Sequence, residues 1–151
     1  KLSIDIIPVD TASAATKDTS ILLVITNSAE PVLPSELLEP GMHVNAAGNN
    51  VWTGRELDTD AIVKFNSIVV DDIEQAKIES GELMRAAETG QFNWGSAIAL
   101  SDIVAGKVQA RTNDLDITLF ESLGIAIEDI AVAERVYQMA IEQGVGHTLP
   151  T

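Results

Sequence analysis

One stretch in the first third of the chain limits the fold more than any other. An apolar run over residues 42–47 leaves a Pro-Gly turn, and the small, polar segment Gly48-Asn49-Asn50 follows it before a helix begins. Short apolar runs that alternate with helical segments are typical of parallel α/β sheets. In such sheets ligands bind at the carboxyl ends of the strands, where small residues let the backbone come close to them. We therefore expect residues 42–47 to form a strand whose following loop lies at a ligand-binding edge.

The same alternation extends over the rest of the chain. Further strands are expected at residues 4–9, 20–25, 67–70 and 116–120. Residues 20–25 are apolar throughout except for the first, which is typical of a central parallel strand that is covered on both faces. The fold class expected is α/β, a single domain with a mainly parallel sheet and helices on both faces.

Helical segments are expected between and after these strands. They are residues 11–18, a turn at 34–38, and residues 56–65, 73–88, 97–105 and 126–143. Asp71 and Asp72 precede one of these helices and are well placed to cap it. The last helix is long and amphipathic, and Gly144 follows it as a usual helix end. Candidates for its buried side are Ile127, Ile130, Ala131, Ala133, Val136, Tyr137 and Ala140.

Composition excludes several classes of function. The chain has 23 acidic and 9 basic side chains and a formal charge of −14, and a surface this acidic repels nucleic acid and anionic lipid. Because the chain has no cysteine, it has no thiolate chemistry, which suits a reducing cytosol. No apolar run approaches the length of a membrane span. We expect a cytoplasmic protein that binds neither membrane nor nucleic acid.

The titratable residues give little support for acid–base or metal chemistry. His43 lies inside a predicted strand and His147 lies near the end of the chain, so a structural role is favoured for both. Asp71, Asp72 and Glu74 offer three carboxylates close together, but helix capping is the simpler explanation for them. No metal site is expected.

Small and polar side chains follow three of the predicted strands. The three loops are Thr26-Asn27-Ser28, Ala46-Ala47-Gly48-Asn49-Asn50 and Glu121-Ser122-Leu123-Gly124. Since the carboxyl ends of parallel strands share one edge, we expect these loops to lie together. Such side chains suit a planar, polyhydroxylated cofactor better than acid–base chemistry. The chain contains no Gly-x-Gly-x-x-Gly and no phosphate-binding Gly-x-x-x-x-Gly-Lys-Ser/Thr.

The order of these segments resembles the ornithine cyclodeaminase and mu-crystallin family. The matching blocks are residues 25–33, 40–48, 55–58, 70–72, 74–76, 79–82, 117–124 and 128–129. The resemblance implies a Rossmann-like fold and an NAD(P)-dependent enzyme. Activities of the family include cyclising deamination of ornithine, alanine dehydrogenation and reduction of cyclic ketimines. Their shared step is hydride transfer between the nicotinamide and an amine or imine carbon.

The resemblance also implies roles for single residues. It places Thr26 and Asn27 along the dinucleotide, Ala47 and Gly48 against the nicotinamide, Ser122 near its carboxamide, and Glu79 toward the substrate.

Two positions depart from the family pattern. Asn50 stands in the substrate region where the cyclodeaminases carry an aspartate, and an amide is no general base, so ornithine cyclodeamination is disfavoured. Glu121 stands where the family usually has lysine.

The 151 residues match only the C-terminal part of such a protein. In the family, a substrate and dimerisation domain, the first Rossmann strand, the glycine loop and the second strand precede the segment that matches residues 4–9. We therefore expect a truncated, partial NAD(P)-binding domain that is not catalytic by itself, with the choice between NAD and NADP open. The alternative is a non-catalytic oligomeric module that binds a small ligand or a protein.

Two apolar surfaces would be bare in such a partial domain. They are the edge of residues 20–25 and the apolar side of residues 126–143. Bare strand edges and large apolar patches favour association with other chains. We expect a homo-oligomer, most simply a two-fold dimer.

Overall fold

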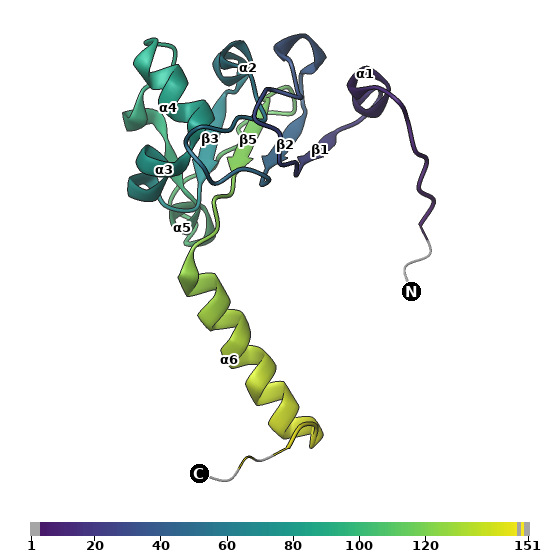
Figure 1. The fold of residues 1–151 in the computed structure, drawn as a ribbon. Coiled ribbons are helices and arrows are strands. Elements are labelled where there is room, and N and C mark those ends of the chain that lie inside the picture. Colours follow the sequence, from purple (N-terminus) through teal and green to yellow (C-terminus); the bar gives the residue numbers. More distant parts are fainter. Residues whose placement is uncertain (1–3, 148, 150–151) are drawn as a thin grey trace.

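The computed structural model describes residues 4–147 and 149. In this part of the chain, five strands form one sheet, most of which is visible in Figure 1. The strands are β1 (Ile21–Val24), β2 (His43–Ala46), β3 (Ser67–Val70), β4 (Ile98–Ala99) and β5 (Thr118–Glu121). Their order in the sheet is β1-β2-β5-β3-β4, and every pair is parallel. The expected parallel α/β class is therefore confirmed, and each of the four strands expected from residue 20 onward overlaps an observed strand, although β5 ends one residue later than expected.

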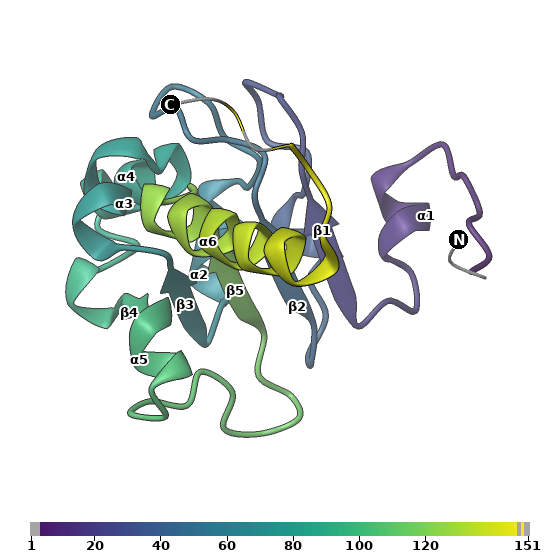
Figure 2. The same cartoon turned by 90° about the horizontal axis from the view of Figure 1, so that it is seen from below.

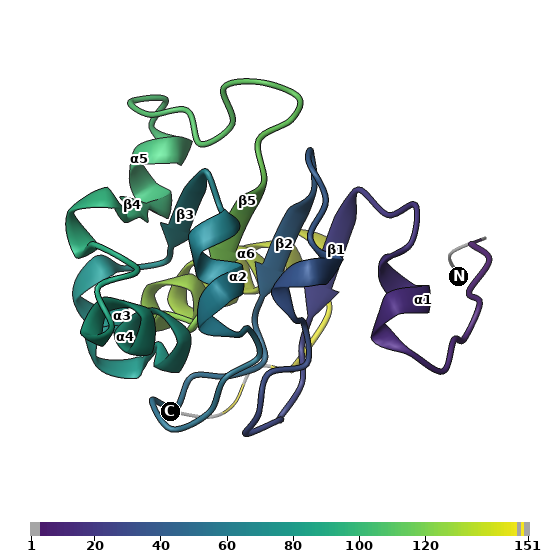
Figure 3. The same ribbon diagram turned by 90° about the horizontal axis from the view of Figure 1, so that it is seen from above.

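Helices lie on both sides of this sheet. They are α1 (Ala12–Thr16), α2 (Thr59–Lys64), α3 (Ile73–Glu79), α4 (Gly81–Glu88), α5 (Leu100–Val104) and α6 (Ala126–Gln143), with two short 3₁₀ helices, η1 (Ser35–Leu37) and η2 (Trp94–Ser96). Figures 2 and 3 show α2 on one side of the sheet and α6 on the other.

The hydrophobic core lies between the sheet and the layer formed by α2 and α4. Val44, Leu119 and Val70 from the three inner strands are completely buried. Ala61 of α2 and Leu83 of α4 are buried against them in one cluster. Because burial of one aliphatic side chain stabilises a fold by about 1.5–3 kcal/mol, this layer holds the inner strands in place.

The strand expected at residues 4–9 is wrong. These residues are exposed and make no strand pairing, and Figure 1 shows them leading away from the sheet before α1 begins. A β-branched run forms a strand only where another strand offers backbone partners. The sheet has β2 on one side of β1, and nothing described here pairs on the other side.

Residues 20–25 form a strand, but the expectation that both of its faces are covered is wrong. Leu22 and Val24 are buried, whereas Ile21 and Leu23 are 63% and 67% exposed. β1 is the outermost strand of the described sheet rather than a central one, and of its two faces only the one toward the core is covered.

The helix expected over residues 73–88 is two helices. Ser80 is extended (φ −76°, ψ 102°), and it ends α3 and caps α4, since its hydroxyl accepts a hydrogen bond from the Leu83 amide at 3.1 Å. A serine hydroxyl can replace a helical backbone acceptor by bonding a nearby amide itself. The helix therefore breaks at Ser80, although the apolar residues on both sides keep a regular helical spacing.

The helix expected over residues 97–105 is also shorter than the pattern indicates. Ile98 and Ala99 pair with Val69 and Val70 as β4, and α5 begins only at Leu100. One edge of β3 has backbone groups that β5 does not pair, and Ile98 and Ala99 pair with them instead of beginning the helix.

The last helix has the bounds expected from the sequence, but its apolar side is not buried in this chain. No residue of α6 is buried, and Ile130 and Val136 are 68% and 59% exposed. Figure 1 shows that α6 leads away from the sheet, so the apolar stripe is not covered by the sheet and its helices. Gly144 ends the helix at a φ of 64°, which favours glycine. Of the helices in the described residues, none combines the length and the apolar character needed to cross a membrane.

Candidate functional site

The three small, polar loops identified in the sequence lie side by side at the carboxyl edge of the sheet. Val24, Ala46 and Glu121 end three neighbouring strands in register. Ala47 then donates its amide hydrogen to the Val24 carbonyl, and Ser122 donates to the Ala46 carbonyl, both at 2.9 Å. The ladder thus continues into the loops, which places Thr26, Ala47 and Ser122 along one edge.

The buried carboxylate of Glu56 bridges two of these loops. Its Oε1 accepts hydrogen bonds from the Thr26 amide at 2.5 Å and from the Thr26 hydroxyl at 2.7 Å. Its Oε2 accepts one from the Gly48 amide at 2.8 Å. Glu56 is only 1% exposed, and its carbonyl also accepts from Val32 and Leu33. Hydrogen bonds to a carboxylate are about twice as strong as neutral ones, so Glu56 holds the loops after β1 and β2 at one spacing.

Two further carboxyl groups, those of Glu82 and Glu121, lie buried in contact with this arrangement. Oε1 of Glu82 accepts a hydrogen bond from the Glu56 amide at 2.6 Å, and the Ser80 hydroxyl donates to Oε1 of Glu121. Burial, together with the charge of Glu82, raises the pKa of Glu121 well above its ordinary value. Burial also raises the pKa of Glu82.

Asp71 holds the third loop. Its Oδ2 accepts hydrogen bonds from the amides of Leu123 and Gly124 at 2.7 and 2.8 Å and from the Ser122 hydroxyl at 3.2 Å. The expectation that Asp71 caps the following helix is therefore wrong, whereas Asp72 does cap α3 through the Gln75 amide at 2.8 Å. The reason is the sheet order: β3 and β5 are neighbours, so the end of β3 faces the loop after β5.

The remaining predicted site residues lie around the same edge. Asn27 and Asn50 are exposed, and Asn49 between the loops donates its side-chain amide to the Ser28 carbonyl at 2.9 Å. Glu79 is half-buried, and Gln75 joins its carboxylate to the Gly124 carbonyl at 2.8 and 2.9 Å. The structure thus brings all seven predicted positions to the edge formed by the three loops and their neighbours, while their roles stay predictions.

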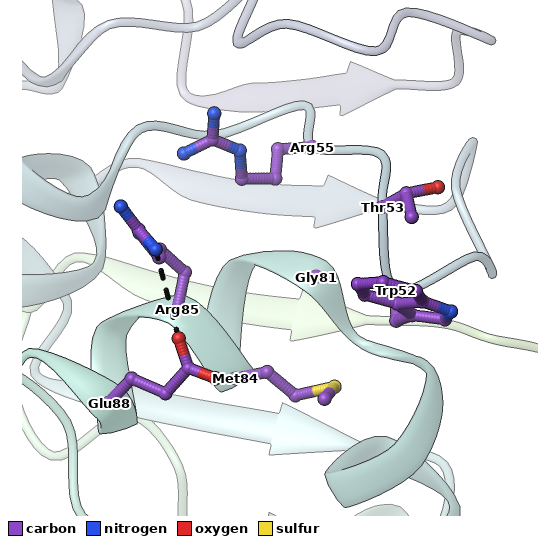
Figure 4. Close-up of a pocket in the computed structure, with 7 residues that line it drawn as sticks. All are labelled: Trp52, Thr53, Arg55, Gly81, Met84, Arg85 and Glu88. Carbon is purple, nitrogen blue, oxygen red and sulfur yellow. Dashed lines mark ion pairs between the residues drawn. The ribbon is translucent and has the colours of Figure 1, made fainter.

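A hollow of about 370 Å³ lies beside this edge, between α4 and the loop before α2 (Figure 4). It is lined by Trp52, Thr53, Arg55, Gly81, Met84, Arg85 and Glu88. Its arginines have weak acidic partners, since Arg85 lies 3.8 Å from Glu88 and Arg55 lies 3.6 Å from Glu30. The sequence pattern gave no signal for this hollow, because its lining comes from two separate segments.

The histidines and the acidic segment after β3 show no sign of a metal site. His43 lies 2.7 Å from the Thr118 hydroxyl through Nδ1 and 3.3 Å from Asn45 Oδ1 through Nε2, which suits the structural role expected for it. His147 is exposed in the segment after α6. Across residues 4–147 and 149, no three acidic or histidine side chains are grouped so that they could hold a metal ion.

Comparison with known proteins agrees with this arrangement of strands and loops. The model of the ornithine cyclodeaminase/mu-crystallin family matches residues 1–144. The chain belongs to the ornithine cyclodeaminase/mu-crystallin family. The family and the Rossmann-like fold class expected from the sequence are thereby confirmed.

Members of the ornithine cyclodeaminase/mu-crystallin family with known names are similar to most of this chain. A Delta(1)-pyrroline-2-carboxylate reductase of Bacillus cereus is 40% identical over 136 residues, which are 89% of this chain and 42% of that protein. The structure of the Thermococcus litoralis Delta(1)-pyrroline-2-carboxylate reductase in complex with NADH and L-proline has a TM-score of 0.88 at 37% identity, over 93% of this chain and 44% of that one.

An archaeal alanine dehydrogenase dimer with bound NAD has a TM-score of 0.83 at 37% identity, over 95% of this chain and 44% of that one. The chain therefore spans less than half the length of the relatives that it matches.

Proposed function

We propose that this chain forms the nicotinamide side of an NAD(P)-dependent oxidoreductase site that transfers hydride between the cofactor and an amine or imine carbon. The observation that carries the proposal is the set of three small, polar loops held at one sheet edge by Glu56 and Asp71. Relatives with 37% identity are named as complexes with NADH and with NAD, which supports the same cofactor class here.

The proposed roles of single residues are those that the family resemblance implies. Thr26 and Asn27 contact the dinucleotide, Ala47 and Gly48 line the nicotinamide, Ser122 lies near its carboxamide, and Asn50 and Glu79 face the substrate. The bound cofactor supplies the hydride chemistry, and these residues orient it and shield one of its faces. Since Asn50 has no carboxylate to take up a proton, reduction or dehydrogenation fits the site better than cyclising deamination.

We propose that residues 1–151 act as one partial Rossmann-like domain. The relatives' remaining length exceeds the length matched here. The 151 residues contain no Gly-x-Gly-x-x-Gly. A pyrophosphate therefore needs groups from outside these residues, and we expect the 151-residue chain alone to bind the cofactor weakly without turning substrate over. The absence of cysteine from the chain fits a cytoplasmic enzyme.

Titration with NADH is the test. We expect a dissociation constant of about 1 mM, equivalent to about −4 kcal/mol, because only one part of the cofactor is contacted. Backbone amide resonances of Thr26, Ala47, Gly48 and Ser122 should shift during the titration. Amides at the opposite end of the strands, such as His43, serve as the internal control and should not move. Shifts spread evenly over the chain, or none at the edge, would contradict the proposal; NADPH in a parallel titration tests the choice of cofactor.

The alternative is a non-catalytic oligomeric module that binds a small ligand or a protein. The exposed edge of β1 and the exposed apolar side of α6 favour it, because a surface of this kind is seldom left bare. The alternative predicts association of the chain without any shift at the loop edge on addition of NADH or NADPH.

Either proposal predicts that the chain associates with itself, most simply as a two-fold dimer. Light scattering at micromolar concentration should give twice the chain mass of 16.1 kDa. Leu23→Lys on β1 and Ile130→Lys on α6 place charges on the two exposed apolar surfaces, and one or both should produce the monomer. Lys64→Glu at an exposed position of α2 is the control for a surface charge change. A wild-type chain that is monomeric under these conditions contradicts the prediction.

A further inference from the structure

Three buried carboxyl groups lie close enough beneath the loop edge to act on one another through their charges, and none has a basic partner within the described residues. Glu56, Glu82 and Glu121 are 1%, 3% and 2% exposed. Within the described residues, the ion pairs of lysine and arginine involve Glu30, Glu74, Glu88 and Asp102 instead. Buried charges that are not paired are strongly unfavourable, so the three groups are not all ionised in the folded chain.

The hydrogen bonds show which group has the weakest support for a charge. Both oxygens of Glu56 accept hydrogen bonds, and Glu82 accepts one from the Glu56 amide. Among the described residues, Glu121 accepts a hydrogen bond only from the Ser80 hydroxyl. Its Oε2, like Oε2 of Glu82, is buried without a hydrogen-bond partner. Backbone amides of Glu56, Leu57 and Glu82 favour the charged form of Glu82, whereas a single side-chain hydroxyl favours that of Glu121. A proton on Glu121 therefore removes the charge that has the weakest support.

We propose that Glu121 holds a proton in the folded chain at neutral pH, and that this neutral acid allows Glu56 to act as the positioning residue of the loops after β1 and β2. The inference concerns the same edge as the proposed function, but neither its argument nor its test needs a bound cofactor.

The charged groups with the largest effect on Glu121 are all acidic. They come from three separate elements: Glu82 on α4, Glu56 before α2 and Asp71 at the end of β3. Burial and these charges raise the pKa of Glu121 from an ordinary value of 4.5. An ionised Glu121 would repel Glu82, whose Oε1 holds the Glu56 amide, and through it would disturb the carboxylate that bridges Thr26 and Gly48.

The raised pKa gives the pH dependence a definite sign. Above an ordinary pKa of 4.5, the unfolded chain has lost this proton while the folded chain keeps it. The contribution of the Glu121 proton to the free energy of unfolding is therefore fully present at a pH below the unfolded-state pKa. It is lost as the pH rises toward the folded-state pKa. One such proton raises the equilibrium constant for unfolding by about tenfold per pH unit between the two values.

Glu121→Gln tests the proposal, because glutamine has the same shape and stays neutral. Urea unfolding of the 151-residue chain between pH 5 and about pH 9 should show that wild type loses stability as pH rises. For each pH unit, the equilibrium constant for unfolding should rise up to about tenfold more in wild type than in the variant. Amide exchange at Thr26 and Gly48, corrected for its intrinsic pH dependence, should show the same difference. Glu128→Gln, at an exposed position of α6, should keep the wild-type profile.

An equal pH slope in wild type and Glu121→Gln would overturn the proposal. A variant that is less stable by the same factor at every pH, as expected for a purely structural role, is one form of that result. If the variant does not fold, carbon NMR of the Glu121 carboxyl in wild type decides the matter. A carboxyl that titrates near its ordinary value refutes the proposal, and one that titrates well above it supports the proposal.

Discussion

Glu56→Gln is expected to lower the free energy of unfolding by about 3 kcal/mol, because a buried carboxylate that accepts three hydrogen bonds loses its charge and one acceptor. Hydrogen bonds to a charged group contribute about 1.5–3 kcal/mol each. The glutamine amide group must face either the Thr26 amide or the Gly48 amide, and both of these are donors. One buried donor is thereby left without an acceptor, and the two loops separate.

Urea unfolding followed by circular dichroism at neutral pH measures the effect. Glu88→Gln is the matched control, since Glu88 is exposed and its ion pair with Arg85 spans 3.8 Å, so a change below about 1 kcal/mol is expected there. Glu56→Asp keeps the charge but shortens the side chain, and it should also destabilise the chain because it no longer reaches both loops. A Glu56→Gln variant within about 1 kcal/mol of wild type would show that the bridge contributes little.

The arrangement of the loop edge was predictable because it depends on a periodic pattern. The strands that contain Leu22, Val44, Ile68 and Leu119 each appear as a short apolar run, and a run of this length between helical segments predicts a parallel strand. Once the strands are parallel, the loops that follow neighbouring strands must share an edge. The proximity of Thr26, Gly48 and Ser122 follows from that geometry alone.

Sequence patterns predicted the structure less accurately where an element needs a surface from outside these residues to pack against. Residues 4–9 and α6 both carry the apolar residues that a strand or an amphipathic helix requires. Periodicity indicates which face would be buried, but it does not show whether the same chain offers a surface to bury it. Residues 4–9 consequently make no strand, and α6 forms with the expected bounds while Ile130 stays exposed.

The buried acids were missed because charged residues are normally assigned to the surface. A signal was present at Glu121, since residues two apart on a strand share a face and Leu119 is fully buried. Glu121 must then point toward the same core. The burial of Glu56 could not be predicted in this way, because Glu56 lies in a loop. The path of that loop depends on the hydrogen bonds that Glu56 itself accepts from Thr26 and Gly48.

Gly48→Ala is expected to destabilise the chain by about 3 kcal/mol, at the upper end of the range for overpacking of an interior. A Cβ at this position would overlap the backbone nitrogen and oxygen of Thr26 and lie 2.5 Å from Oε1 of Glu56. Gly48 does not adopt a positive φ, so the requirement for glycine comes from space rather than from backbone conformation. Backbone atoms of the neighbouring loop have little freedom to move away.

Gly95→Ala is the matched control, because Gly95 also lacks a positive φ and its added Cβ would meet only the Asn93 side chain, at 3.2 Å. A change below about 1 kcal/mol is expected there. Gly48→Ala should also remove the NADH-induced shift of the Thr26 amide even in conditions where the variant remains folded, because the methyl group forces apart the two loops that Glu56 joins. A Gly48→Ala chain with wild-type stability would mean that the loops after β1 and β2 can separate freely, and the contact between them would then have no part in forming the edge.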